Sequence, residues 1–198
     1  MTILLGTNNR HKVAEISQLI AHEMASAEIK SLIDFPSVPT VMEDEPTLEG
    51  NALKKARSAY ENTGILTLAD DTGLECYYLE LAPGVISARY AGERATYEDN
   101  NRKLLAALNG VPPRRRQARF RCVMAIVGDG VERIVEGKVE GRILESPRGA
   151  QGFGYDPLFV PEGWTKTYAE MTISEKNGLS HRAIALRRAI EVLRELRS

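Results

Sequence analysis

Two adjacent aspartates after a short apolar run constrain this chain more than any other feature of its sequence. Residues 65–68 are apolar or β-forming, and Asp70 and Asp71 follow before the pair Thr72-Gly73. Because Asp and Gly favour turns, the pattern predicts a strand that ends in two carboxylates and breaks at Thr72-Gly73. Successive strand residues point to opposite faces, so we expect Asp70 and Asp71 to face different ways.

The position of these carboxylates favours a functional site, with a purely structural role as the alternative. In α/β proteins, ligands bind at the carboxyl ends of strands. A carboxylate there can hold Mg²⁺ or act as a general base. The alternative is an Asx turn, in which Asp70 or Asp71 accepts a hydrogen bond from the backbone ahead of Gly73. One carboxylate can also serve a site while the other holds the turn.

The composition argues against nucleic acids and membranes as partners. The 198 residues are 43% hydrophobic and 27% charged, enough to build one domain with its own core, and the formal net charge is -1. A chain so close to neutral generates no field that would attract nucleic acid or a membrane surface. No apolar run reaches the length of a membrane helix, and the N-terminal run is too short for a signal peptide. Cys76 and Cys122 are far apart and match no metal spacing, so we expect buried thiols and a reducing, cytoplasmic location.

The N-terminus has the pattern strand, polar loop, helix. Residues 2–5 suit a buried strand, residues 6–12 are polar, and apolar residues then recur at helical spacing. Backbone N–H groups at a helix N-terminus bind anions, and Lys12 adds a charge suited to phosphate. The loop lacks the P-loop pattern. The alternative is therefore a solvated helix start capped by Asn8 or Asn9.

An acidic, proline-containing stretch precedes the next predicted helix. Residues 34–50 contain five acids and three prolines but no lysine or arginine, which predicts a loop. Thr47 is a good N-cap for a helix that extends to about Asn62. The loop acids are either solvated charges or, if the loop lies near Asp71, the source of a second metal-binding carboxylate. We expect the cationic residues of the helix on its solvated face: Lys54, Lys55 and Arg57.

An arginine-rich stretch leads into a predicted hairpin. Residues 114–121 contain five arginines, but Arg119 and Arg121 alternate with apolar residues, as on a half-exposed strand. No interleaving of aromatic and basic residues supports base stacking, so we expect no specific nucleic-acid binding. The strand continues to Val127, turns at residues 128–130 and returns, which predicts an antiparallel hairpin on a mixed sheet.

Two later stretches suggest contacts with a ligand. Residues 148–157 combine several glycines with Phe153 and Tyr155, and either ring can stack on a nucleobase or anchor the turn in the core. Basic residues at a helix N-terminus are unfavourable unless an anion binds there. Three such residues are expected at the start of the C-terminal helix: Lys176, His181 and Arg182.

Five short motifs occur in the order found in one known family. Residues 7–12 match T-x-N-x-x-K, and residues 70–73 match D-D-[ST]-G. Residues 83–90 match P-G-x-x-S-A-R-Y. The last two motifs are G-F-G-Y-D-P at residues 152–157 and S-H-R at residues 180–182. Together they span nearly the whole chain, which resembles the inosine triphosphate pyrophosphatase family.

The resemblance implies a fold and a reaction. The fold is α/β in a single domain, residues 1–198, with two lobes around a long mixed β-sheet, flanking helices and an active site in the cleft between the lobes. The reaction is hydrolysis of the deaminated purine nucleoside triphosphates ITP, dITP, XTP and dXTP to the monophosphate and pyrophosphate. A homodimer is implied as well. Two alternatives remain: a Maf-like nucleotide pyrophosphatase of other specificity, and a non-catalytic nucleotide-binding protein on the same scaffold.

The resemblance also implies a cofactor and a catalytic residue. Asp71 matches the proton acceptor that activates a water molecule. The cofactor is Mg²⁺, with Mn²⁺ as a possible substitute, held by Asp71 and an acid of the loop. Gly50 stands where the family usually has Glu, but the register of the surrounding residues favours Glu43 as this acid, with Glu45 second.

The remaining roles concern the nucleotide. The resemblance places the triphosphate near Lys12 and Lys176, and the purine against Phe153. A donor such as Arg182 would donate a hydrogen bond to a 6-oxo group and be left without a partner opposite the 6-amino group of adenine. The full set of predicted substrate-binding residues is Thr7, Asn8, Asn9, Arg10, His11, Lys12, Thr72, Phe153, Gly154, Tyr155, Asp156, Lys176, His181 and Arg182.

Overall fold

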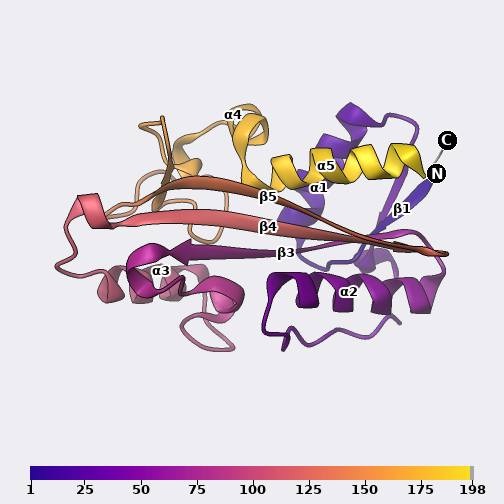
Figure 1. The fold of residues 1–198 in the computed structure, drawn as a ribbon, viewed down its shortest axis with the longest axis horizontal. Helices are drawn as coiled ribbons and strands as arrows, with labels where there is room; N and C mark the ends of the chain where they lie inside the picture. Colours follow the sequence, from indigo (N-terminus) through magenta and orange to yellow (C-terminus); the bar gives the residue numbers. More distant parts are fainter. Residues whose placement is uncertain (197–198) are drawn as a thin grey trace. The chain divides into compact units, whose positions relative to one another are not determined.

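A mixed β-sheet organises the fold (Figure 1). The computed structural model describes residues 1–196, and the predicted domain also includes Arg197 and Ser198, which lie outside the described residues. The strands are β1 (Thr2–Leu5), β2 (Glu28–Ser31), β3 (Thr67–Cys76), β4 (Gln117–Gly128), β5 (Val131–Ile143) and β6 (Phe159–Pro161). Within residues 1–196 they form a sheet in the order β2-β1-β3-β4-β5-β6. β1 is parallel to β2 and β3, whereas β5 and β6 are antiparallel, which confirms the predicted mixed sheet.

Helices connect and flank the strands. The α-helices are α1 (Arg10–Glu23), α2 (Leu48–Thr63), α3 (Tyr97–Ala107), α4 (Ile173–Leu179) and α5 (His181–Glu195). Short 3₁₀ helices are η1 (Leu32–Asp34), η2 (Tyr77–Leu79), η3 (Gly84–Arg89), η4 (Pro113–Arg115) and η5 (Tyr168–Glu170). In the described part of the chain, no helix is long and apolar enough to cross a membrane.

The chain divides into two compact units, each with its own apolar core. The first contains residues 1–71, residues 122–137 and the C-terminal segment from Arg182. Its core is formed by residues of β1, α1, β4 and α5. The second unit contains residues 72–121 and 138–181. Its core is formed around the rings of three aromatic residues: Phe120, Phe159 and Tyr168.

Polar side chains fix the starts of the helices where the sequence predicts them. The side chain of Asn9 accepts hydrogen bonds from the backbone N–H groups of His11 and Lys12, so it caps α1. Thr47 caps α2 in the same way. Thr96 and Asp99 form a capping box at the start of α3. The sequence analysis does not predict α4, a short helix between the glycine-rich loop and α5.

The predicted turn at Thr72-Gly73 is wrong, because β3 runs without interruption from Thr67 to Cys76. β3 lies between β1 and β4 in the sheet, so pairing along the strand outweighs the local turn preference of these residues. Gly73 serves close packing instead, since a Cβ there would lie 2.7 Å from the carbonyl oxygen of Gly84. The alternative Asx turn is therefore also wrong.

Candidate active site

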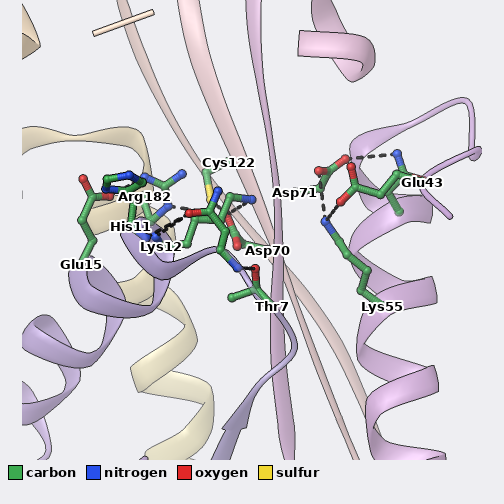
Figure 2. A network of polar contacts seen from close by, with 12 residues as sticks. Thr7, His11, Lys12, Glu15, Glu43, Lys55, Asp70, Asp71, Cys122 and Arg182 are labelled. Carbon is green, nitrogen blue, oxygen red and sulfur yellow. Dashed lines mark hydrogen bonds and ion pairs between the residues drawn. The ribbon is translucent and has the colours of Figure 1, made fainter. Parts of the chain in front are cut away.

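Asp70 and Asp71 point to opposite sides of β3, as the alternation of strand side chains predicts (Figure 2). Figure 1 draws α1 and α5 on one side of this part of β3 and α2 on the other. Asp70 faces α1 and α5, where it meets Lys12 and Arg182. Asp71 faces α2, where it meets Lys55. The two carboxylates therefore occupy separate environments.

Asp70 anchors a buried network of ion pairs. Its Oδ2 lies 3.0 Å from Nζ of Lys12 and 3.5 Å from Nε of Arg182. Nη1 of Arg182 is also 2.5 Å from Oε2 of Glu15 on α1. The Sγ of Cys122 is 3.9 Å from the same Asp70 oxygen. Burial raises the pKa of Asp70, but the charges of Lys12 and Arg182 outweigh it and hold the pKa well below its usual range.

Asp71 belongs to a second cluster that contains another carboxylate. Nζ of Lys55 lies 3.2 Å from Oδ1 of Asp71 and 2.5 Å from Oε1 of Glu43. Nδ2 of Asn51 donates to Oδ2 of Asp71 at 3.2 Å. Burial raises the pKa of Asp71, and the charge of Glu43 adds to this effect while that of Lys55 opposes it. An aspartate with a raised pKa accepts a proton more readily than an exposed one, as a general base requires.

The acidic loop, residues 43–45, lies along α2 through contacts that each of its three residues makes. Glu43 pairs with Lys55, and the exposed Asp44 pairs with Lys54. The backbone N–H of Glu45 donates to Oδ1 of Asn51 at 3.0 Å. These contacts bring Glu43 to Asp71, two residues that the sequence places far apart. They support Glu43 over Glu45 as the second carboxylate.

The predicted solvated face of α2 is therefore wrong at Lys55. Its side chain is only 11% exposed, whereas those of Lys54 and Arg57 are 37% and 51% exposed. Asn51 is fully buried and was also missed. A signal was present in the sequence, because residues four apart on a helix lie on the same face, as Asn51 and Lys55 do.

The pair Asp71 and Glu43 fits a divalent cation. Hard cations bind carboxylate oxygens, and both carboxylates already face one positive charge, the ammonium group of Lys55. Among residues 1–196, no group of three or more His, Cys, Asp or Glu side chains is arranged to hold a metal ion. A metal at this pair would thus need further oxygen ligands from a substrate or water.

The N-terminal loop presents polar groups beside the Asp70 network. Asn8, Arg10 and His11 are exposed at the start of α1, whereas Lys12 turns toward Asp70. The backbone N–H of Asn9 donates to Oγ1 of Thr7 at 3.2 Å, so the loop is held by its own side chains. The structure thus gathers the predicted residues of this loop at one helix N-terminus, where an anion is favoured.

In the second unit, Asp156 organises the glycine-rich loop. Its Oδ2 accepts a hydrogen bond from the N–H of Phe153 at 3.0 Å and lies 2.6 Å from Nζ of Lys176. The same ammonium group is 5.2 Å from the centre of the Phe153 ring. Gly152 has a φ of +75°, and a Cβ there would lie 2.0 Å from Oδ2 of Asp156. A side chain at position 152 is therefore excluded by both conformation and space.

The two aromatic residues of this loop have different environments. Tyr155 is buried and its hydroxyl donates to the carbonyl of Ser87 at 2.9 Å, so it anchors the loop in the core. Phe153 is half-buried. The carbonyl of Gly154 accepts a hydrogen bond from the side chain of Asn101. Of the two rings, Phe153 is the better placed for stacking on a base.

The predicted clustering of three basic residues at one helix N-terminus is wrong. Lys176 lies within α4, which ends at Leu179, whereas His181 and Arg182 begin α5. His181 is buried and its ring stacks on Phe120, with centroids 4.5 Å apart. Thr72 is half-buried on β3, next to Asp71.

The sequence and the fold of this chain match those of known proteins. A model of the Ham1 family matches residues 3–192. A dITP/XTP pyrophosphatase from Thermoanaerobacter sp. (strain X514) is 48% identical over 186 residues, which are 94% of this chain and 93% of the relative. A dITP/XTP pyrophosphatase from Desulforamulus reducens is 47% identical over 197 residues, 99% of this chain and 97% of the relative. Among solved structures, a HAM1 protein from Coxiella burnetii has a TM-score of 0.88 and 40% identity, covering 98% of this chain and 99% of that chain.

Proposed function

This chain belongs to the Ham1 family, and from that premise we propose that it hydrolyses dITP, ITP, XTP and dXTP to the nucleoside monophosphate and pyrophosphate. The observation that carries the proposal is that two adjacent carboxylates have different environments. Asp70 forms ion pairs with Lys12 and Arg182, whereas Asp71 has a raised pKa and lies beside Glu43. A carboxylate of the second kind can accept a proton from water.

The reaction forms one bond and breaks one at the α-phosphorus, and it transfers one proton. A water oxygen attacks the α-phosphorus, the water proton passes to a carboxylate oxygen of Asp71, and the bond from the α-phosphorus to the bridging oxygen breaks. Pyrophosphate leaves with that electron pair. A divalent cation, Mg²⁺ or Mn²⁺, held by Asp71 and Glu43 would neutralise the negative charge that develops on the phosphate oxygens.

The residues of the chain position the nucleotide. Lys12 and Lys176 neutralise the triphosphate, and the N-terminal loop supplies backbone N–H groups at the start of α1. Thr72 bonds a phosphate oxygen or a water beside Asp71. Phe153 stacks on the purine ring.

Selection among purines rests on hydrogen-bond direction. His181, Arg182 and the backbone around Tyr155 and Asp156 read the edge of the base. A donor N–H opposite the 6-oxo group of hypoxanthine or xanthine would be left unpaired by the 6-amino group of adenine. A site built in this way discriminates by roughly 10⁴.

Release of pyrophosphate from dITP, XTP, GTP, ATP and dTTP, with Mg²⁺ and with EDTA, tests the proposal. We expect metal-dependent release that is fastest with dITP and XTP. A preference for dTTP would contradict the substrate assignment in favour of a Maf-like specificity. Tight nucleotide binding without release would contradict the reaction itself.

We also propose that the protein acts in the cytoplasm as a homodimer. Cys76 and Cys122 are both buried and form no disulfide, which is consistent with a reducing compartment. Sedimentation at micromolar concentration tests the assembly, and a single monomeric species would contradict it.

A further inference from the structure

We propose that Asn51 is a positioning residue, whose side-chain amide holds the acidic loop against Asp71 and so fixes the pair of carboxylates for the metal. This inference rests on the proposed function, because it concerns how the proposed metal ligands are brought together. In this proposal Asn51 does not contact the substrate, and it acts through its hydrogen bonds to Asp71 and to the backbone of Glu45.

Both ends of the Asn51 amide are used. Its Nδ2 donates to Oδ2 of Asp71 at 3.2 Å, and its Oδ1 accepts from the backbone N–H of Glu45 at 3.0 Å. A carboxylate can only accept and a backbone N–H can only donate, so these partners fix the orientation of the amide. The residue is fully buried, where a lost hydrogen bond is costly. Aspartate cannot donate to Asp71, and alanine can make neither contact.

Gly50 gives the acidic loop the space that this arrangement needs. A Cβ at position 50 would lie 2.8 Å from Cβ of Glu45 and 3.2 Å from Oγ1 of Thr47. A side chain at this position would therefore displace the backbone of Glu45, whose N–H is the group that Asn51 holds. Glycine at position 50 therefore lets the acidic loop lie close to the start of α2 in this chain.

The same contact helps to position Glu43. Glu43 is two residues before the point at which Asn51 holds the loop, and Lys55 is one helical turn after Asn51 on the same face of α2. Glu43 and Asp71 then share the ammonium group of Lys55. If the loop is released from Asn51, Glu43 is less constrained beside Asp71, because only the pairs Glu43–Lys55 and Asp44–Lys54 still hold the loop along α2. Metal binding should weaken more than nucleotide binding.

Two variants disturb this contact from opposite sides. Asn51→Ala removes the amide, and Gly50→Ala pushes the acidic loop away from it. The matched control is Asn62→Ala. It removes an exposed asparagine on the same helix, whose Nδ2 donates to the carbonyl of Ser58. Circular dichroism establishes that each variant is folded before it is compared.

The first readout is Mn²⁺ affinity without nucleotide, measured by electron paramagnetic resonance of the free ion. The second is the Mg²⁺ concentration that gives half-maximal pyrophosphate release from dITP. We expect both values to weaken by roughly tenfold to a hundredfold in Asn51→Ala and Gly50→Ala, the usual effect of removing a group that orients a metal ligand. At saturating Mg²⁺, the KM for dITP should stay within about threefold of that of the unmodified protein, and Asn62→Ala should match that protein throughout.

Wild-type Mn²⁺ affinity in a folded Asn51→Ala or Gly50→Ala protein would overturn the inference. A lower kcat with an unchanged metal requirement would also overturn it. If Asn51→Ala does not fold, Gly50→Ala alone decides the outcome. If the unmodified protein releases no pyrophosphate with any metal, the proposed function fails, whereas the Mn²⁺ affinities still judge the role of Asn51.

Discussion

Replacing Asp70 by asparagine should destabilise the fold. The Asp70 side chain is fully buried, with Lys12 at 3.0 Å and Arg182 at 3.5 Å. Removing one partner of a buried ion pair costs about 3–5 kcal/mol. Arg182 still has its ion pair with Glu15 in this variant, and the Lys12 side chain is 15% exposed and can reach water. We therefore expect a loss at the lower end of this range, about 3 kcal/mol in the free energy of unfolding. In a protein of this size that corresponds to a fall in Tm of about 6–12 °C.

The effect of Asp70→Asn should depend on pH with a defined sign. The charges of Lys12 and Arg182 hold the pKa of Asp70 below its usual range in the folded protein. The charged carboxylate therefore adds stability above its unfolded pKa of about 3.9, and this contribution is lost as the pH falls through the folded pKa. The difference in Tm between Asp70→Asn and the unmodified protein should be largest near neutral pH and shrink below about pH 4.

The neighbouring substitution, Asp71→Asn, should have the opposite profile. Burial raises the pKa of Asp71, so at neutral pH the folded protein bears a cost for keeping it charged. Asparagine removes that cost, and Glu43 still pairs with Lys55. We expect Tm to stay the same or rise, while pyrophosphate release falls by about 10²-fold or more because the general base is lost.

Thermal unfolding in EDTA from pH 3.5 to 8 measures the stability effects. Pyrophosphate release from dITP at saturating Mg²⁺ measures turnover. The reasoning is refuted if Asp70→Asn melts like the unmodified protein at neutral pH. It is equally refuted if Asp71→Asn loses more stability than Asp70→Asn, or if Asp71→Asn retains its turnover.

Three further changes test other parts of the site. Lys55→Met leaves Asp71 and Glu43 without the ammonium group between them, so Tm should fall in the absence of metal. Mg²⁺ should then raise Tm more in this variant than in the unmodified protein, and an equal rise in both would contradict this. Asp156→Ala leaves buried Lys176 without its carboxylate, and urea denaturation should show a loss of about 3–5 kcal/mol in the free energy of unfolding. Gly152→Ala forces a side chain into a φ of +75° against Asp156, so it should lower the unfolding midpoint in urea; a midpoint equal to that of the unmodified protein would show that the loop adapts.

Features set by local chemistry could be predicted from the sequence. Asn9 and Thr47 begin helices where their hydrogen-bonding side chains predict them. The opposite orientation of Asp70 and Asp71 follows from the geometry of any strand. The turn at Thr72-Gly73 was predicted from local preference and failed, because β3 has neighbours on both sides that pair with its backbone.

Features set by contacts between distant segments could not be predicted. The periodicity of α2 shows which residues share a face, but not that Asn51 and Lys55 meet Asp71. Placing the acidic loop against α2 depends on three separate contacts, none of which leaves a pattern in the sequence. The contacts of Arg182 with both Glu15 and Asp70 likewise depend on the folded structure and cannot be inferred from the sequence.

Hydrolysis of dITP in water enriched in ¹⁸O tests the proposed reaction most directly. Attack of water on the α-phosphorus places one ¹⁸O atom in dIMP and none in pyrophosphate, and mass spectrometry of both products distinguishes them. We predict label only in dIMP. Label in pyrophosphate, or inorganic phosphate as the first product, would contradict attack at the α-phosphorus.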